Sequence, residues 1–194
     1  MSESKLFSKF LLLDSLKGKS ILFDSESNNA RNHFALSFLN EILSAGIPAI
    51  YFSFGQSQEM LKSPGLNLGK LKFIDCYSKA RSYDSLSSEL NDFIDSFKGP
   101  YLLAFNSLSS FLAFNSPNTL YHFLFFEHSR IKKRNAIALH CIDSCLHDSK
   151  VFGFIQKLSD VHLKGIEEEG TVKISILPSS KNFFGFKTKE FIVF

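Results

Sequence analysis

Residues 20–54 read SILFDSESNNARNHFALSFLNEILSAGIPAIYFSF, and the fold prediction rests on this stretch. It begins with the apolar run SILFD, which is typical of a buried strand. The polar run SESNNARN follows, and apolar residues then recur at helical spacing from about Arg31 to Ala45. Gly46 and Pro48 end the helix before a second apolar run, AIYFSF. The stretch therefore predicts a strand, a polar connection, a helix and a second buried strand.

The same alternation continues along the rest of the chain. The apolar runs KLKFIDCY, YLLAF and NAIALH predict strands, and helical spacing lies between them. The last two runs, GTVKISIL and KEFIVF, alternate polar and apolar residues, as antiparallel strands do when one face meets solvent. This order predicts an α/β fold of three layers, with a mostly parallel sheet, helices on both faces and a C-terminal antiparallel hairpin. Because no long linker interrupts the 194 residues, we expect a single domain over residues 1–194.

Composition limits the class of protein. The formal net charge of +3 is too small to indicate nucleic-acid binding by itself. The apolar stretch KFLLLDSL is interrupted by Asp14 and Lys17 and is too short to span a membrane, so we expect a cytoplasmic protein without a membrane segment. The run HCIDSCLHD, residues 140–148, groups two His and two Cys residues, but its spacing matches no usual zinc pattern. We therefore expect no metal site.

Five stretches, taken in order, resemble the RecA-like ATPase core, in particular the branch that contains KaiC and the archaeal RadA recombinases. The segments FALSFL and NSLSSFL are the closest matches, and the second is similar to the family's aspartate-serine-leucine-serine motif. The resemblance implies a RecA-like domain over nearly the whole chain. The five stretches are residues 20–54, QEMLKSPGLNLGKLKFIDCYS, YLLAFNSLSSFL, NAIALH and LSDVHLKGIEEEGTVKISIL.

In that family the connection after the first strand is a phosphate loop. A working loop needs glycines so that backbone N–H groups approach the phosphates, a lysine for the β and γ phosphates, and Ser or Thr on magnesium. When FALSFL fixes the alignment, the two glycines fall on Ser25 and Ala30, the lysine on Arg31 and the hydroxyl residue on Asn32. All four positions are altered, so the resemblance implies a degenerate phosphate loop.

The acidic positions of the family are altered as well. Asn106 stands where the family has the acidic residue of the magnesium site. Gly55 or Gln56 stands where a glutamate activates the attacking water, and the nearest acid is Glu59. His140 falls where a polar residue senses the γ phosphate, at the predicted end of a strand; an ordinary buried histidine is the alternative.

These losses remove the groups that stabilise phosphoryl transfer, so we expect a pseudo-ATPase without ATP or magnesium as cofactor. Members of the family assemble side by side. The resemblance therefore implies a structural or regulatory subunit of a homo- or hetero-oligomer, with RecA-like subunits as partners. Two precedents are the recombinase paralogues that support a filament-forming partner, and the ring-forming RecA-like subunits of the Elongator complex.

Three alternatives stay open at this stage. The run SESNNARN is an ordinary polar connection, because Ser and Asn favour turns and helix caps. A divergent ATP-binding protein or ATPase would use Arg31 and Glu59 in place of the usual residues. A regulator of DNA repair, recombination or RNA modification would bind nucleic acid through Lys132, Lys133 and Arg134, although a solvated helix end explains that cluster equally well.

Overall fold

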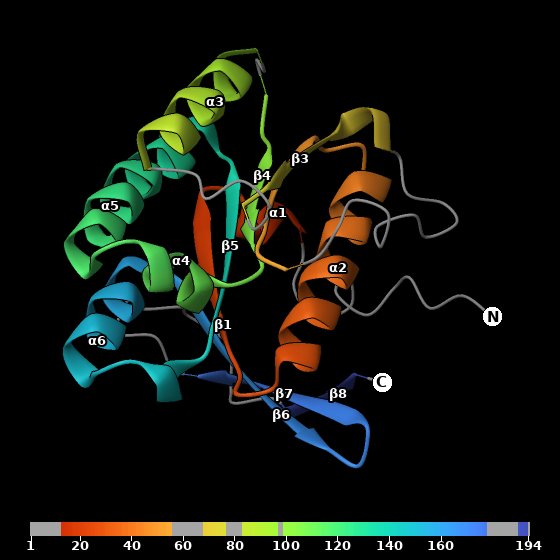
Figure 1. Cartoon of the computed structure of the whole chain (residues 1–194). Helices are drawn as coiled ribbons and strands as arrows, with labels where there is room; N and C mark the ends of the chain where they lie inside the picture. The colour runs from red at the N-terminus through yellow and green to blue at the C-terminus, as the bar shows by residue number, and fades with distance from the viewer. Residues whose placement is uncertain (1–12, 56–67, 77–82, 97–98, 178–189, 194) are drawn as a thin grey trace.

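The computed structural model describes residues 13–55, 68–76, 83–96, 99–177 and 190–193 (Figure 1). Among the described helices, none is both long and apolar enough to cross a lipid bilayer. The strands are β1 Lys19–Asp24, β2 Ala49–Ser53, β3 Leu71–Asp75, β4 Leu102–Phe105, β5 Ile137–Ile142, β6 Val161–Glu168, β7 Thr171–Leu177 and β8 Glu190–Val193. The α-helices are α1 Leu13–Leu16, α2 Asn28–Ser44, α3 Tyr83–Ser96, α4 Leu108–Phe114, α5 Pro117–Arg134 and α6 Ser149–Leu158, and two 3₁₀ turns are η2 Leu68–Lys70 and η3 Ser144–Leu146.

The described strands form one sheet with the order β3-β2-β4-β5-β1-β6-β7-β8. The first six strands in this order pair in parallel, whereas β7 pairs antiparallel with both β6 and β8. Every residue of β2, β4 and β5 is buried, which explains why these strands read as continuous apolar runs. The predicted α/β fold, with a mostly parallel sheet and a C-terminal antiparallel hairpin, is confirmed.

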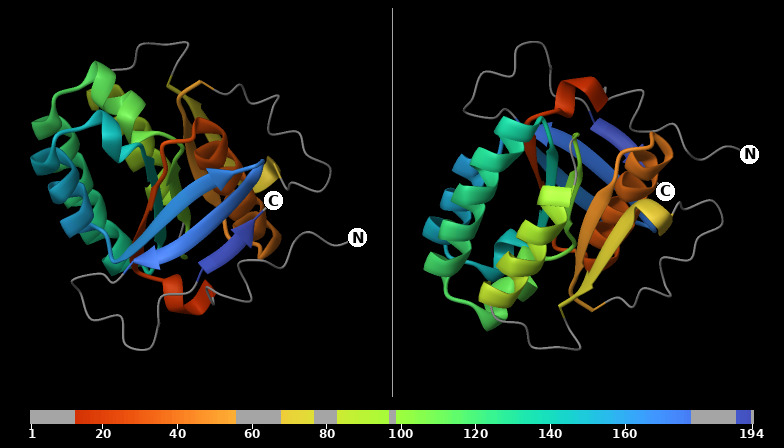
Figure 2. Two further views of the ribbon diagram at one scale, coloured as in Figure 1. Left: turned by 90° about the horizontal axis from the view of Figure 1, so that it is seen from below. Right: turned by 90° about the horizontal axis from the view of Figure 1, so that it is seen from above.

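Figure 2 shows α2 on one face of the sheet and α3, α4, α5 and α6 on the other, and a hydrophobic core lies under each group. The α2-side core is built from α2, including Phe34, Phe38 and Ile42, and from the strand residues that face it. The α5-side core contains buried residues of α3, α4, α5 and α6, such as Phe111 and Phe123. Burial of apolar area on both faces is the main stabilising contribution, at roughly 25 cal/mol per Å². The three-layer prediction is therefore also confirmed.

The boundary of β5 differs from the prediction. The strand continues to Ile142, because its last residues pair with the last residues of β1, with Asp24 opposite Ile142. The prediction that this strand ends at His140 is wrong, and Asp143 is the first residue beyond it. The helical segment predicted near residues 56–63 lies outside the described residues.

Gly165 allows β6 to lie close against the ring of Phe23, a residue of the neighbouring strand β1. A Cβ atom at Gly165 would lie 2.9 Å from Cε2 of Phe23, closer than side chains pack. Phe23 is fully buried and stacks on Phe34 of α2, with ring centroids 4.0 Å apart, so its ring has little room to move. The close approach of strand and ring therefore requires glycine at this position.

We expect Gly165→Ala to lower the free energy of unfolding by about 1–3 kcal/mol, because the added methyl group overpacks a filled core. Gly153→Ala is the matched control. A Cβ at Gly153 meets nothing within 4 Å, and the residue lies inside α6, where alanine is favoured over glycine by up to about 1 kcal/mol. Urea unfolding of both variants measures the difference, and equal stabilities would contradict the packing argument.

Candidate functional site

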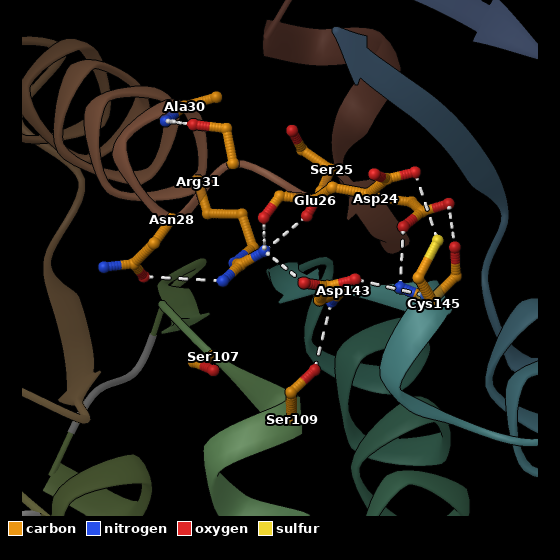
Figure 3. Close-up of polar contacts among 12 residues, drawn as sticks. Asp24, Ser25, Glu26, Asn28, Ala30, Arg31, Ser107, Ser109, Asp143 and Cys145 are labelled. Carbon is orange, nitrogen blue, oxygen red and sulfur yellow. Dashed lines mark hydrogen bonds and ion pairs between the residues drawn. The ribbon is translucent and has the colours of Figure 1, made fainter. Parts of the chain in front are cut away.

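Ligand crevices in α/β sheets form where neighbouring parallel strands send their following helices to opposite faces. β1 and β5 are such neighbours. The helix after β1 is α2, in the α2-side core, and the helix after β5 is α6, in the α5-side core. The carboxyl ends of β1 and β5 therefore mark the place to look for a site. Figure 3 shows that polar side chains from several segments converge there.

The connection between β1 and α2 is short. β1 ends at Asp24 and α2 begins at Asn28, so residues 25–27 alone join them. Ser27 is the N-cap of α2, and its Oγ accepts a hydrogen bond of 3.1 Å from the N–H of Ala30. This cap starts the helix earlier than the prediction near Arg31. Of the run SESNNARN, the last five residues are helical and do not form a loop.

The side chain of Arg31 turns back onto this connection (Figure 3). Its Nη1 donates to the carbonyl oxygens of Ser25 and, at 3.1 Å, of Glu26. The same nitrogen forms an ion pair of 3.3 Å with Oδ2 of Asp143, and Nη2 lies 3.5 Å from Oδ1 of Asn28. Arg31 is 6% exposed, so the guanidinium is an internal part of the structure. The connection thus directs carbonyl oxygens, which accept hydrogen bonds, toward a buried cation.

Asp143 is held in place from three sides. Its Oδ1 accepts the N–H of Cys145 at 3.1 Å, which caps η3. Its own N–H donates to Oγ of Ser109 in α4 at 3.0 Å. The Ser109 hydroxyl also lies 2.9 Å from Nε2 of His147. The ion pair with Arg31 therefore ties α2 to α4 and to the segment after β5.

Asp24 forms a second link at the same edge. Its Oδ1 accepts the N–H of Ser144 at 3.0 Å, and its Oδ2 accepts the Ser144 hydroxyl at 2.8 Å. The same Oδ2 forms an ion pair of 3.0 Å with Nζ of Lys164 on β6. Asp24 is buried, so both carboxylate oxygens have partners where an unpaired charge would be costly.

Glu167 on β6 covers the N-terminus of α2. Its carboxylate accepts hydrogen bonds from the Ser27 hydroxyl and, at 3.3 Å, from the side-chain amide of Asn29. These two hydrogen bonds lower the pKa of Glu167 below its usual range. A carboxylate at a helix N-terminus complements the helix dipole, so the protein itself supplies the anion that this position attracts.

Asn32 and Asn106, aligned with two positions of a magnesium site, lie together. Nδ2 of Asn106 donates to Oδ1 of Asn32 at 3.4 Å, and Oδ1 of Asn106 accepts the N–H of Phe54 at 2.8 Å. Asn106 is 1% exposed. The pair therefore joins α2 to the ends of β2 and β4 through neutral amides.

The remaining predicted site residues lie elsewhere or outside the described residues. Ala30 is fully buried in the α2-side core, and Gly55 lies two residues beyond the end of β2 with a φ of +105°. Lys132, Lys133 and Arg134 lie in the last turn of α5, at the opposite edge of the sheet from Arg31, and Arg134 pairs with Asp95 at 3.3 Å. Gln56 and Glu59 lie outside the described residues.

His140 lies in the α5-side core and not at the carboxyl edge. Its ring centroid is 5.8 Å from that of Phe105, and its Nε2 has no hydrogen-bond partner among the residues that the structure describes. Burial, with a smaller contribution from His128, lowers the pKa of His140 to about 4. The side chain is therefore neutral near pH 7 and belongs to the core.

No group of three or more His, Cys, Asp or Glu side chains among the described residues could hold a metal ion. Within HCIDSCLHD, Cys141 is fully buried, and burial raises the pKa of its thiol to about 12. Cys145 is exposed and its Sγ lies 3.1 Å from a Glu26 carboxylate oxygen. The two thiols thus face different surroundings.

Sequence reasoning missed Asp24, Asp143 and Glu167. Asp24 and Asp143 do carry a signal, because Asp24 ends one apolar strand and Asp143 directly follows another, at the edge where parallel strands place polar groups. Glu167 carries none, since it lies 140 residues from Ser27 and the hairpin alone brings it to α2.

Comparison with models of known protein families gives no match for this chain, and no curated protein sequence matches it.

Proposed function

We propose that this chain is a non-catalytic relative of the RecA-like ATPases of the KaiC and RadA type. It works as a structural or regulatory subunit of a homo- or hetero-oligomer, with a recombinase or another RecA-like ATPase as candidate partner. One observation carries the proposal: the Arg31 guanidinium occupies the β1–α2 connection, where its Nη1 donates to two carbonyl oxygens and pairs with Asp143.

The phosphates of a nucleotide need hydrogen-bond donors and positive charge from such a connection. Here the carbonyl oxygens of Ser25 and Glu26 point at Arg31, and its charge is already paired. The N-terminus of α2 already holds the carboxylate of Glu167. A triphosphate would have to break these contacts and approach several carboxylates, which supports the view that this edge does not bind ATP.

The positions aligned with the family's magnesium site do not carry the ligands of an active member. A hydroxyl and a carboxylate would hold and orient the metal in an active member of the family. The amides of Asn32 and Asn106 carry no charge and bond to each other. This neutral pair supports a structural role for the edge, in which polar groups fix the ends of β2, β4 and α2.

Calorimetric titration with ATP and magnesium tests the negative part of the proposal. We expect no saturable heat up to about millimolar ATP, corresponding to a binding free energy weaker than about −4 kcal/mol. Magnesium-dependent binding at micromolar affinity would overturn the proposal and favour the divergent ATPase.

Purification from the native host tests the positive part. We expect the chain to elute as an oligomer whose second component, identified by mass spectrometry, is a RecA-like subunit or a further copy of this chain. A strictly monomeric chain, at concentrations where family members assemble, would contradict the proposal.

A further inference from the structure

α5 and α6 lie side by side on the outer face of the α5-side core (Figure 1). Between them runs a groove of about 560 Å³. Its apolar walls include Leu120, Tyr121 and Leu124 from α5 and Val151, Phe154 and Ile155 from α6. The groove lies on the outer surface of the molecule and shares no lining residue with the network around Arg31.

The rim of the groove exposes aromatic rings. Phe154 is 51% exposed, and its ring centroid lies 5.1 Å from that of Tyr121. Phe125 is also exposed and stacks against Tyr121 at 6.3 Å. Large exposed aromatic side chains that gather beside an apolar groove are costly to leave in water and mark a binding surface.

The helices α5 and α6 carry mostly positive charge. α5 and α6 together carry six Lys or Arg residues and a single acid, Glu127, which is buried and paired with Arg130. Asp148, at the end of the groove, is engaged as the N-cap of α6. Lys150 lines the groove and Lys157 is exposed on the same helix; within the described part of the chain, neither forms an ion pair. Lys132 and Lys133 lie in the last turn of α5, beyond the part of that helix that lines the groove.

We propose that the groove binds an acidic amphipathic helix of a partner protein. Apolar side chains of that helix, at helical spacing, would enter the groove, while its Asp and Glu residues would face Lys150 and Lys157 of α6. The stretch of α5 along the groove, from Pro117 to Leu124, is about two helical turns long, which matches a short helical segment.

Charge argues against a second copy as the occupant, because two copies of this surface would bring lysines against lysines. Single-stranded nucleic acid shares the negative charge but needs free aromatic faces on which bases stack. Here the Tyr121 ring contacts the rings of Phe125 and Phe154, so the aromatic residues form a continuous apolar wall. A concave aliphatic groove with such a wall fits side chains better than bases.

The inference rests on the proposed function, because it names the surface through which the chain would work with a partner. The proposed function and the groove inference can be disproved independently. ATP binding would overturn the proposed function and leave the groove as it is, whereas failure of the groove experiment would leave the ATP result unchanged.

The test uses the full chain, immobilised, and a displayed library of random peptides about 16 residues long, enough for a short helix. We expect the selected peptides to share Leu, Ile, Phe or Trp at helical spacing together with Asp and Glu. A synthetic peptide from the selection should bind less tightly to Phe154→Ala and to Lys157→Glu, by about tenfold each, and more weakly at high salt.

Matched controls are available on the same chain. Ile166→Ala removes a side chain of similar exposure, 49%, from β6, and Lys72→Glu reverses an exposed charge on β3. Both should leave the peptide affinity within about twofold. Circular dichroism checks that each variant is folded, and the exposed positions of Phe154 and Lys157 favour this.

Three results would overturn the inference: no selected peptide, selected peptides without acidic residues, or equal losses in the control variants. A labelled oligothymidylate of about 20 nucleotides is tested in parallel. If it binds with a dependence on Phe154 that the peptides do not show, the groove is a nucleic-acid surface and the proposed occupant is wrong.

Discussion

Arg31→Met is expected to lower the free energy of unfolding by about 3–5 kcal/mol, because it leaves Asp143 as a buried carboxylate without its cation. The carbonyl oxygens of Ser25 and Glu26 lose their donor at the same time. Asp143 is 8% exposed, so water cannot fully replace the guanidinium. Urea unfolding followed by circular dichroism measures the loss.

The double variant Arg31→Met/Asp143→Asn separates the ion pair from the rest of the site. With the charge on residue 143 removed, the double variant should be less destabilised than the sum of the two single variants, by about 2 kcal/mol. A sum that holds within about 0.5 kcal/mol would show that the two side chains do not interact. In that case the guanidinium would not be the group that organises this edge.

The second large effect is on pH dependence, and it comes from two buried groups with opposite signs. Burial lowers the pKa of His140 from 6.5 to about 4, so between these values the unfolded chain binds a proton that the folded chain does not. His140 therefore contributes stability above pH 6.5 that is lost as the pH falls to about 4. The loss amounts to about 3 kcal/mol for this shift.

Glu127 acts in the opposite direction. Burial raises the pKa of its carboxyl from 4.5 to about 7, although Arg130 lowers it in part. Stability from Glu127 is therefore complete below pH 4.5 and is lost as the pH rises through about 7. The magnitude is again about 3 kcal/mol, so the two groups largely cancel each other in the window that they share.

Two single variants separate the pH dependence of stability due to His140 from that due to Glu127. In Glu127→Gln, stability should fall on acidification from about pH 6.5 to pH 4, because His140 acts alone. In His140→Leu, stability should fall as the pH rises from about 4.5 to 7. Urea midpoints measured across this range give both profiles, and parallel profiles in the two variants would contradict the assignment.

Much of the fold could be predicted from the sequence, because periodicity is a local signal. The runs SILFD and AIYFSF are strands, and the spacing of Phe34, Phe38 and Ile42 places them on one buried face of α2. The antiparallel hairpin follows from the alternation in GTVKISIL, in which Val172, Ile174 and Ile176 are buried. Periodicity does not fix element boundaries as closely, since a single cap at Ser27 moves the start of α2 by several residues.

The site could be predicted only in part. The resemblance assigned Asn32, through FALSFL, and Asn106, through NSLSSFL, to one magnesium site, and the two side chains lie in contact. It did not indicate that the Arg31 side chain turns inward, because this depends on Asp143, a residue 112 positions away. The contact of Glu167 with Ser27 depends in turn on the pairing of β6 with β1, which brings the end of β6 to the start of α2. Such long-range polar pairs have no period that a sequence pattern could reveal.

The place of β1 in the sheet has a consequence for how the chain is made. Both neighbours of β1 come late in the sequence, since β5 begins at Ile137 and β6 at Val161. During synthesis β1 therefore emerges well before either neighbour, and its two edges stay unpaired until β5 and β6 have been made. Sheets that depend on such distant pairings form slowly and expose apolar surface in the meantime. We therefore expect β1 to join the sheet late in folding, after β5 and β6 have been made.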